Sequence, residues 1–375
     1  MSTAGTGTGM TLPASCYVDS AWFERELERI FGRMWVYVGR AEELPTAGAR
    51  VVREVAGESL LLVADGMGRP RAFFNVCRHR GTRLCAGDAT APTASRSIQC
   101  PYHAWTWDLD GRLVSAPGIE GAAGFSESDY PLHEVRLEQW DGLLFACLDP
   151  AAGSLARQLG ELPDRFRAWG LERLRSVRSI TYDVQANWKL IIQNYSECLH
   201  CPIIHPALQQ LSHYLSGVNE ACGVGDAYLG GKMDLRPGVE TMSLGGRLAG
   251  NRLPGLDEDQ CRLVQYYAVL PNLLLSLHPD YAMIHELRPL TQSRTEVVCS
   301  WHFDPESIAR AGFDPEPVVA FWDLTNRQDW HVSELSQLGI ASRAYRPGPY
   351  SPREELLHAF DLRILELMGE PRPVR

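Results

Sequence analysis

Two short stretches of this 375-residue chain, "CRHRG" (77–81) and "CPYHAW" (100–105), decide how at least a third of it folds. Each places a cysteine two or three positions before a histidine, and 20 residues separate the two pairs. Each pair follows a short apolar run, so we expect a strand to end there and a loop to carry the ligands. The four candidate ligands of one metal centre are Cys77, His79, Cys100 and His103.

Three interpretations of these residues compete. Cysteine and histidine in loops usually have no joint role, but two tight pairs with their own turn residues make chance a weak explanation. Zinc accepts two thiolates and two imidazoles, although its sites usually keep both cysteines in one short knuckle. A [2Fe–2S] cluster with one iron on two cysteines and the other on two histidines needs each loop to mix the two residue types. The mixed loops favour this cluster.

The stretches "CRHRGTRLCAG" (77–87) and "IQCPYHAWTWDLDGRLVSAPG" (98–118) resemble the cluster-binding signature of Rieske oxygenases, the ring-hydroxylating and demethylating family. The spacing is slightly longer than is usual there, with "DATAPTAS" (88–95) as the expected loop insertion. Cys85 matches no ligand, and we interpret it as a packed thiol. The order of strand and helix patterns along the chain predicts an α+β fold, and the resemblance implies its two domains. The fold comprises a β-rich Rieske [2Fe–2S] domain over residues 37–150 and a helix-grip-like catalytic domain, antiparallel sheet plus helices, over 1–36 and 151–375.

A second cluster of metal-binding residues lies in "NYSECLHCPIIHP" (194–206). Glu197 and His200, three positions apart, would share one face of a helix. Because the residue before a proline avoids the α conformation, we expect that helix to end near Cys201 and the chain to turn back, bringing His205 beside His200. Two histidines and a carboxylate can hold non-haem Fe(II) with positions left open. On the residues alone, buried core histidines are an equally good explanation.

The segment also resembles the iron-binding segment of the Rieske oxygenases. The resemblance implies that His200 and His205 bind a mononuclear Fe(II), and that Glu197 and Asn194 belong to the catalytic set. Glu197 would connect His200 to a cluster histidine, His103, of a neighbouring subunit, because the two metal centres of one chain are expected to lie far apart. This electron path implies a homo-oligomer, most simply a head-to-tail trimer.

The third iron ligand must come from another segment. The stretch "FWDLTNRQDWHVSELSQLG" (321–339) offers Asp323, Asp329 and Glu334. In the family the carboxylate ligand precedes a Glu-x2-Gln-x-Gly element, which matches Glu334 to Gly339. The resemblance therefore implies Asp329, with Asp323 as the alternative. Ser333 stands where many relatives have cysteine.

The composition limits which binding partners and which cellular location are expected. The net charge of −10 disfavours nucleic acid as a partner. The first residues lack a basic start and an apolar core, and the longest apolar run (266–277) is too short to span a bilayer, so we expect a cytoplasmic protein without membrane contact. Its ten cysteines are then expected to be thiols or metal ligands instead of disulfides.

The hydrophobic pattern predicts the order of the elements. Residues 20–35 have helical spacing with Asp19 or Ser20 as the cap, and short strands with an Asp-Gly hairpin at 108–113 follow to about 150. Helical patterns recur at 155–170 and 187–200. A strand-rich section comes next, and helices at about 315–338 and 352–369 close the chain.

The resemblance implies the terminal component of a Rieske-type mono- or dioxygenase. It would use O2 and electrons from a separate NAD(P)H-dependent reductase or ferredoxin to hydroxylate or demethylate a small organic substrate. Glu197 and "LLLSLHPDYAMIHEL" (273–287) are similar to the branch of the family that acts on quaternary ammonium compounds. Aromatic rings can bind the cation of such a compound. Candidate rings are Tyr214, Tyr228, Tyr266, Tyr267 and Trp322, and "LSHYLSGVNEACGVGDAYLGGKMD" (211–234) is expected to cover the pocket. The alternatives are an aromatic acid or natural-product substrate, and a non-catalytic electron-transfer or binding protein.

Overall fold

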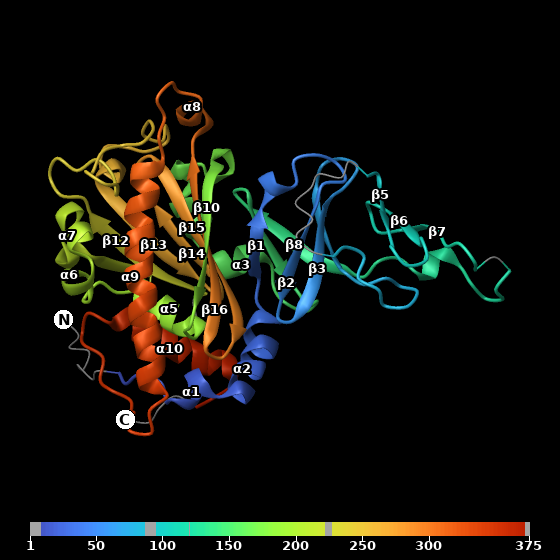
Figure 1. The fold of residues 1–375 in the computed structure, drawn as a ribbon, viewed down its shortest axis with the longest axis horizontal. Coiled ribbons are helices and arrows are strands. Elements are labelled where there is room, and N and C mark those ends of the chain that lie inside the picture. Colours follow the sequence, from blue (N-terminus) through green and yellow to red (C-terminus); the bar gives the residue numbers. More distant parts are fainter. Residues whose placement is uncertain (1–8, 87–94, 120, 222–226, 372–375) are drawn as a thin grey trace. The chain divides into compact units, whose positions relative to one another are not determined.

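The structure is a computed structural model that describes residues 9–86, 95–119, 121–221 and 227–371. It divides into two compact units, Phe31–Leu155 and the residues on either side of that segment (Figure 1). The smaller unit consists mainly of antiparallel strands and the larger one combines an antiparallel sheet with helices, so the predicted α+β class is confirmed. Among the described helices, none is long and apolar enough to cross a membrane.

The smaller unit, Phe31–Leu155, is built almost entirely of strands. A six-stranded sheet has the order β1-β9-β8-β4-β3-β2, and a three-stranded sheet has the order β5-β6-β7. The strands are β1 (Val36–Arg40), β2 (Arg50–Val55), β3 (Glu58–Ala64), β4 (Pro70–Phe74), β5 (Ser97–Gln99), β6 (Thr106–Asp108), β7 (Leu113–Ser115), β8 (Glu134–Trp140) and β9 (Leu143–Cys147). Two 3-10 turns, Ala41–Glu43 and Glu127–Asp129, complete the unit. The short strands predicted for this region are confirmed.

The Asp-Gly signal at 108–113 forms the predicted turn between β6 and β7. The Asp108 carboxylate accepts hydrogen bonds from the backbone N–H groups of Asp110 (3.0 Å) and Arg112 (2.8 Å). Gly111 has φ +83°, a conformation that glycine adopts without steric cost. This turn returns the chain so that Trp107 and Leu113 enter the core that also holds Cys77 and Cys100.

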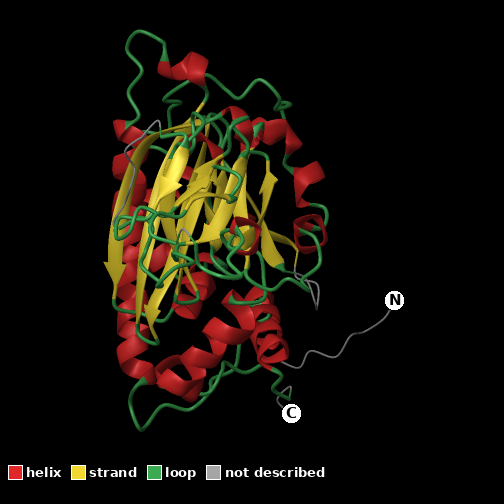
Figure 2. Ribbon diagram, turned by 90° about the vertical axis from the view of Figure 1, so that its right-hand side faces the viewer, coloured by secondary structure: helices red, strands yellow, loops and turns green. Residues whose placement is uncertain are grey.

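The larger unit contains a seven-stranded antiparallel sheet in the order β10-β16-β15-β14-β13-β12-β11. Figure 2 shows the strands of the protein in yellow and its helices in red. Its strands are β10 (Arg175–Val184), β11 (Val218–Ala221), β12 (Tyr228–Asp234), β13 (Leu263–Val269), β14 (Leu273–Leu277), β15 (Tyr281–Thr291) and β16 (Arg294–Phe303). Tyr266 on β13 pairs with Ser276 on β14, and Ser276 pairs with Met283 on β15. Paired residues of antiparallel strands point to the same face, so these three share one face of the sheet.

The 25-residue helix α9 (Glu316–Ile340) crosses the sheet (Figure 1). Its buried positions recur every three or four residues and form one apolar face. The other helices of this unit are α1 (Ser15–Val18), α2 (Ser20–Glu26), α3 (Leu155–Leu159), α4 (Leu162–Arg165), α5 (Trp188–Tyr195), α6 (Cys201–Ile204), α7 (Pro206–Leu211), α8 (Pro305–Ile308) and α10 (Glu355–Met368). Short π or 3-10 segments are Leu27–Phe31, Arg167–Trp169, Leu171–Arg173, Tyr214–Ser216 and Gln260–Arg262. Asp19 caps α2 as predicted, by accepting the N–H of Ala21.

The helical pattern predicted at 155–170 is broken into short pieces. Gly160, with φ +55°, separates α3 from α4, and Gly170, also with φ +55°, ends the turn that follows. A Cβ atom at Gly160 would lie 3.1 Å from the Tyr228 hydroxyl. Close packing against that ring therefore favours glycine here and stops one continuous helix.

Helix α5, which leads to the functional segment, is held by buried polar contacts. The Asn187 side chain accepts the N–H of Lys189 (3.0 Å), and its backbone N–H donates to Gln337 of α9 (2.9 Å). The Lys189 ammonium lies 2.5 Å from the Glu26 carboxylate, and neither side chain is exposed. A buried ammonium is tolerated only when it is paired, so this contact joins α5 firmly to α2.

The buried carboxyl of Asp361 on α10 predicts a pH dependence of stability. Burial raises its pKa from 3.8 to about 7, against the effect of hydrogen bonds from Tyr350 and Gln193 and of the Lys189 charge. Between these two pKa values the folded protein holds a proton that the unfolded chain has lost. The free energy of unfolding contributed by this group therefore falls as the pH rises through that window. Asp361→Asn keeps a neutral side chain and should abolish this fall.

Thermal unfolding of both proteins from about pH 5 to about pH 9 checks this expectation. The Tm of the variant minus that of the wild type should increase up to about pH 7 and then level off. A Tm difference that stays constant over the whole range would contradict it.

Candidate active site

The two cysteine–histidine loops of the smaller unit have matching backbones. Cys77 comes after β4 and Cys100 directly after β5. In each loop the carbonyl of the cysteine accepts the N–H of the residue four positions later, Gly81 (3.0 Å) or Ala104 (3.1 Å). Both of those residues have positive φ, +75° and +57°. The same turn is thus made twice, once with glycine and once with alanine.

The four predicted cluster residues lie together in this unit. The side chains of Cys77 and Cys100 are 4% and 2% exposed, whereas that of His79 is exposed and that of His103 half-buried. The His79 and His103 rings lie 4.8 Å apart. Burial raises the pKa of the Cys77 thiol, and the neighbouring Cys100 adds to the shift. Two thiols at the buried end and two imidazoles at the outer end fit a [2Fe–2S] cluster with different ligands on its two irons.

Aromatic side chains hold the two imidazoles. The Trp105 ring stacks on His79 at 4.9 Å with an interplanar angle of 5°, and the Tyr102 ring lies 3.7 Å from His103. Cys85 is half-buried and packs against the same core, in line with its interpretation as a packed thiol. Most of the loop insertion expected at 88–95 lies outside the described residues.

In the larger unit, the predicted helix through Glu197 and His200 is wrong in its extent. Helix α5 ends at Tyr195, and Glu197 and His200 lie in the turn after it. Pro202 occupies the first turn of the new helix α6. Proline is well accommodated there because the first N–H groups of a helix have no intrahelical partner. Pro202 therefore helps to begin a helix, where we expected it to end one.

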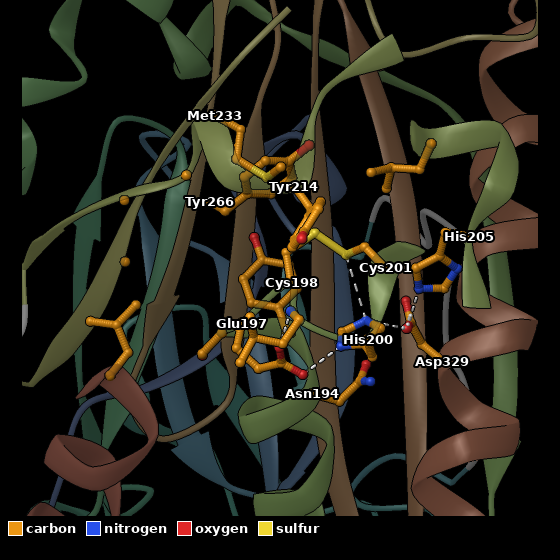
Figure 3. A pocket seen from close by; sticks show the side chains of 18 of the residues that line it. Asn194, Glu197, Cys198, His200, Cys201, His205, Tyr214, Met233, Tyr266 and Asp329 are labelled. Atoms are coloured by element: carbon orange, nitrogen blue, oxygen red, sulfur yellow. Dashed lines mark hydrogen bonds and ion pairs between the residues drawn. A yellow bond between two sulfur atoms is a disulfide. The ribbon is translucent and has the colours of Figure 1, made fainter. Parts of the chain in front are cut away.

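The turn nevertheless brings the predicted residues together. The Nε2 atoms of His200 and His205 lie 3.3 Å and 2.7 Å from the same oxygen, Oδ1 of Asp329 on α9 (Figure 3). Ligands about 2.1 Å from one ion and at right angles to each other lie about 3 Å apart. The three atoms therefore fit an ion held by two imidazoles and a carboxylate, the donor set of non-haem Fe(II).

The outer nitrogen of each imidazole is held by an oxygen acceptor. His200 Nδ1 lies 2.5 Å from Oε1 of Glu197, and His205 Nδ1 lies 2.8 Å from Oε1 of Gln328. Such partners place the proton on Nδ1 and leave Nε2 to bind the metal. Gln328 was not predicted from the sequence, in which its position directly before Asp329 is the only indication of a role.

Charges in the site favour a cation. Burial opposes ionisation of Asp329, but hydrogen bonds from His200 and His205 more than offset it, so the pKa of Asp329 is lowered. Burial alone would lower the pKa of His200, yet Asp329 and Glu197 raise it to about 10. Two carboxylates around two imidazoles thus stabilise positive charge at the position where an ion would bind.

The other two acids considered for this site have different partners. Asp323 accepts a hydrogen bond from the Tyr182 hydroxyl (2.8 Å) and pairs with Arg327 (3.0 Å). Glu334 accepts the backbone N–H of Gln185 (3.0 Å). Of the three candidates, the structure brings Asp329 to the histidines.

Cys198 and Cys201, on either side of His200, form a disulfide. The expectation that all cysteines are thiols or ligands is therefore wrong for this pair. The tight turn between α5 and α6 places their Cα atoms 5.0 Å apart, within the range that a disulfide spans. The bridge constrains the turn that carries His200 (Figure 3).

A cavity of about 300 Å³ in the larger unit includes the two histidines and Asp329 in its wall. Tyr214, Tyr266 and Met233 lie around another part of this wall (Figure 3). The segment expected to cover the pocket lines it at 217–219 and 229–233, while 222–226 lies outside the described residues. Of the five candidate rings, Tyr214, Tyr266 and Trp322 line the cavity. Tyr228 and Tyr267 do not, whereas Tyr195 and Trp330, which sequence analysis did not select, do.

A second hollow, of about 600 Å³, borders the same residues from another side. Asn194, Glu197 and His200 line both this hollow and the 300 Å³ cavity. Ser333, Tyr345 and Arg346 also line the hollow. Glu197 and His200 are 13% and 16% exposed, so the site is accessible from more than one direction.

Family models and known proteins match this architecture. The model for the ring hydroxylating alpha subunit (catalytic domain) matches residues 171–370, and that for the Rieske [2Fe-2S] domain matches residues 34–126. The chain is 40% identical over 343 residues to the carnitine monooxygenase oxygenase subunit of Escherichia coli, covering 90% of this chain and 86% of that protein. It is 28% identical over 393 residues to the glycine betaine monooxygenase oxygenase subunit of Pseudomonas aeruginosa, covering 96% and 90%.

The fold agrees with that of a solved structure. The quaternary ammonium Rieske monooxygenase CntA superposes with a TM-score of 0.82 at 23% identity, over 96% of each chain. Fold and site together define an iron-dependent oxygenase with a separate electron-transfer domain. The chain belongs to the ring-hydroxylating alpha-subunit family of Rieske oxygenases, and it is a terminal oxygenase with a Rieske [2Fe–2S] cluster and a mononuclear iron as cofactors.

Replacing Asp329 and Asp323 separately tests the assignment of the third ligand. Asp329→Ala removes the oxygen that both histidines face, so the purified protein should contain two irons per chain instead of three. Asp323→Ala is the matched control on the same helix and should keep three. Iron quantitation with electron paramagnetic resonance of the reduced cluster distinguishes them, because the cluster signal should persist in both. Loss of the mononuclear iron in Asp323→Ala alone would reverse the assignment.

Proposed function

We propose that this oxygenase acts on a quaternary ammonium compound. The observation that carries the proposal is the cavity beside the His200, His205 and Asp329 site, whose wall is rich in aromatic rings. Tyr266 lies near two of them, with ring centroids 6.1 Å from Tyr195 and 6.4 Å from Trp322. Aromatic faces attract a cation that has been stripped of water.

The distribution of charge around the cavity supports a cationic substrate. Its acidic residues include Glu197 and Asp329. The cationic residues of its wall are Lys232 and Arg353. The Lys232 ammonium pairs with Glu220 at 2.8 Å, and Arg353 is exposed on the loop before α10. Away from the iron site, a quaternary ammonium group in the cavity would therefore meet mainly aromatic rings, with little repulsion from Lys232 or Arg353.

Relatives point to the same substrate class. The proteins that match over most of this chain include oxygenase subunits named for carnitine and for glycine betaine. Both compounds carry a trimethylammonium group. We extend that class to this chain because its cavity has the aromatic wall that such a group needs.

We also propose which residues hold the cofactors. Cys77, Cys100, His79 and His103 would bind the cluster in the unit Phe31–Leu155, close to the domain expected at 37–150. His200, His205 and Asp329 would bind the iron in the remaining unit. Bound iron supplies O2 activation with electrons from the cluster. Glu197 and Gln328 would keep both imidazoles oriented by accepting their Nδ1 protons, and the cavity rings would hold the substrate and exclude water.

The accessibility of Glu197 supports a role between subunits. Its carboxylate holds His200, and both residues also line the 600 Å³ hollow. Leu335 and Leu338 on α9 are 53% and 71% exposed, and exposed apolar side chains of this kind are suited to covering by another subunit. We propose that His103 of a neighbouring subunit docks here in a closed trimer, with Asn194 beside the path. Electron transfer between subunits is described for a related quaternary ammonium Rieske monooxygenase.

The chain is an oxygenase component, so its electron donor is a separate reductase or ferredoxin. We propose that it draws on NAD(P)H, and that the enzyme works in the cytoplasm, where that nucleotide is available. Nucleic acid and membranes have no part in the proposed reaction.

Substrate-dependent O2 consumption tests the substrate class. With a surrogate reductase and NADH, trimethylammonium compounds should stimulate O2 uptake and aromatic acids should not. Trp322→Leu removes one ring of the wall and should raise KM by about 5- to 30-fold, the effect of one desolvated cation–π contact. Tyr228→Phe, outside the cavity, is the matched control and should keep the wild-type KM. Stimulation by aromatic acids alone would favour the alternative substrate class.

Glu197→Gln tests the path between the metal centres. A carboxylate can accept protons from two imidazoles at once, whereas an amide offers one acceptor oxygen. The variant should bind both metals, yet single-turnover transfer from the cluster to the iron should slow by about 10- to 100-fold. Stopped-flow bleaching of the cluster band measures the rate, and iron quantitation is the control. An unchanged rate would refute the bridging role.

A further inference from the structure

A chain of hydrogen bonds across α9 fixes the orientation of one cavity residue. At its outer end the Asp323 carboxylate, which can only accept, receives the Tyr182 hydroxyl proton at 2.8 Å. Arg327 donates a hydrogen bond to the other oxygen at 3.0 Å. The Tyr182 hydroxyl uses its one proton in this hydrogen bond, so its oxygen can only accept from its next neighbour.

That neighbour is Asn326, which is 3% exposed. Its amide nitrogen donates to the Tyr182 oxygen (3.4 Å) and to the Cys299 sulfur (3.5 Å). Its amide oxygen consequently faces His285 on β15, 3.2 Å from Nε2. An amide oxygen cannot donate, so His285 must carry its proton on Nε2.

His285 then presents an unprotonated Nδ1 atom. Burial lowers the pKa of the imidazole to about 4, so the ring is neutral near pH 7. The side chain is 1% exposed and lines the 300 Å³ cavity, and Nδ1 has no hydrogen-bond partner within the described part of the chain. A buried acceptor without a partner is unfavourable, because it has lost its hydrogen bond to water and gained none in return. Its position at the cavity wall indicates that a bound molecule supplies the proton.

Two donors line the same cavity and also lack partners among the described residues. They are the Tyr266 hydroxyl and the Trp330 indole N–H, both buried. The His285 and Trp330 rings lie 6.0 Å apart, and Tyr195 lies within 6.2 Å of both His285 and Tyr266. One acceptor and two donors in one wall match a group that both donates and accepts, which is a hydroxyl.

We propose that His285 Nδ1 accepts a hydrogen bond from a substrate hydroxyl, whose oxygen accepts from the Tyr266 hydroxyl. The assignment rests on the proposed function and narrows it. A quaternary ammonium nitrogen has four carbon substituents and no N–H, and an ionised carboxylate has no proton either. Only a further X–H group can satisfy His285. The preferred substrate is therefore a hydroxylated quaternary ammonium compound, and one lacking a hydroxyl, such as glycine betaine, is a poor substrate.

L-Carnitine and γ-butyrobetaine test this assignment, because they differ only by one hydroxyl group. The wild-type kcat/KM for L-carnitine should exceed that for γ-butyrobetaine by about 10- to 100-fold, the effect of leaving one buried polar group unpaired. His285→Phe should remove most of this preference by lowering kcat/KM for L-carnitine. His285→Gln should restore part of it, since its amide can donate to Asn326 and accept from the substrate.

Two further variants exclude a merely structural effect. Tyr266→Phe deletes a single oxygen, so it should fold normally and should lower kcat/KM for L-carnitine more than that for γ-butyrobetaine. Met283→Leu, on the same strand and cavity face, is the matched control and should change kcat/KM for both compounds by the same factor, leaving their ratio unaltered.

The outcomes separate the two levels of the proposal. Equal wild-type kcat/KM for the two compounds, or variants of His285 and Tyr266 that lower both by the same factor, would overturn the hydroxyl assignment while the proposed function stands. Failure of every trimethylammonium compound to stimulate O2 uptake by the wild type would overturn the proposed function, and this assignment with it.

Discussion

One oxygen atom, Oδ1 of Asp329, organises the larger unit. The Nε2 atoms of His200 and His205 lie 3.3 Å and 2.7 Å from it, so a helix near the C-terminus meets a turn that is more than a hundred residues earlier in the chain. Each imidazole is held from behind, by Glu197 or by Gln328, and the turn is constrained further by the Cys198–Cys201 disulfide. Donors that already converge before an ion binds need little rearrangement on binding, and these contacts supply that preorganisation.

Helix α9 concentrates several functions in two turns because its faces have different neighbours. Asp329 faces the histidines, Gln328 holds one of them, and Trp330 lines the cavity. Asp323 and Asn326 form the hydrogen-bond chain that reaches His285. Spacings of three, four and seven residues return to one helical face, so Asp323, Asn326 and Trp330 project together toward the sheet. Asp323, the acid that competes with Asp329 in the sequence, thus has Tyr182 and Arg327 as its partners instead of the two histidines.

The sequence predicted features that depend on local pattern. Paired cysteines and histidines indicated the cluster loops, alternating apolar runs indicated the short strands, and helical spacing indicated α9 and α10. The end of α5 was misplaced because helical periodicity shows which face is buried and not where the helix stops, and Pro202 fits either the end or the start of a helix. The Gln328–His205 contact spans 123 residues, and no local pattern reports such a pairing. The same limit explains why Tyr228 and Tyr267 were selected in place of Tyr195 and Trp330.

The cavity combines two kinds of recognition that differ in physical origin. Aromatic rings attract a cation with little dependence on its orientation, so in the proposed function they would retain any trimethylammonium group near the proposed iron site. A neutral imidazole of fixed tautomer is directional, since its lone pair accepts only from a donor that lies along one line. The charge of Asp323 sets that tautomer through Tyr182 and Asn326 without entering the cavity itself. In this proposal the rings attract the substrate and the His285 imidazole orients it toward the iron. The imidazole discriminates between substrates more strongly than the rings do, because a buried acceptor that is left unpaired is costly.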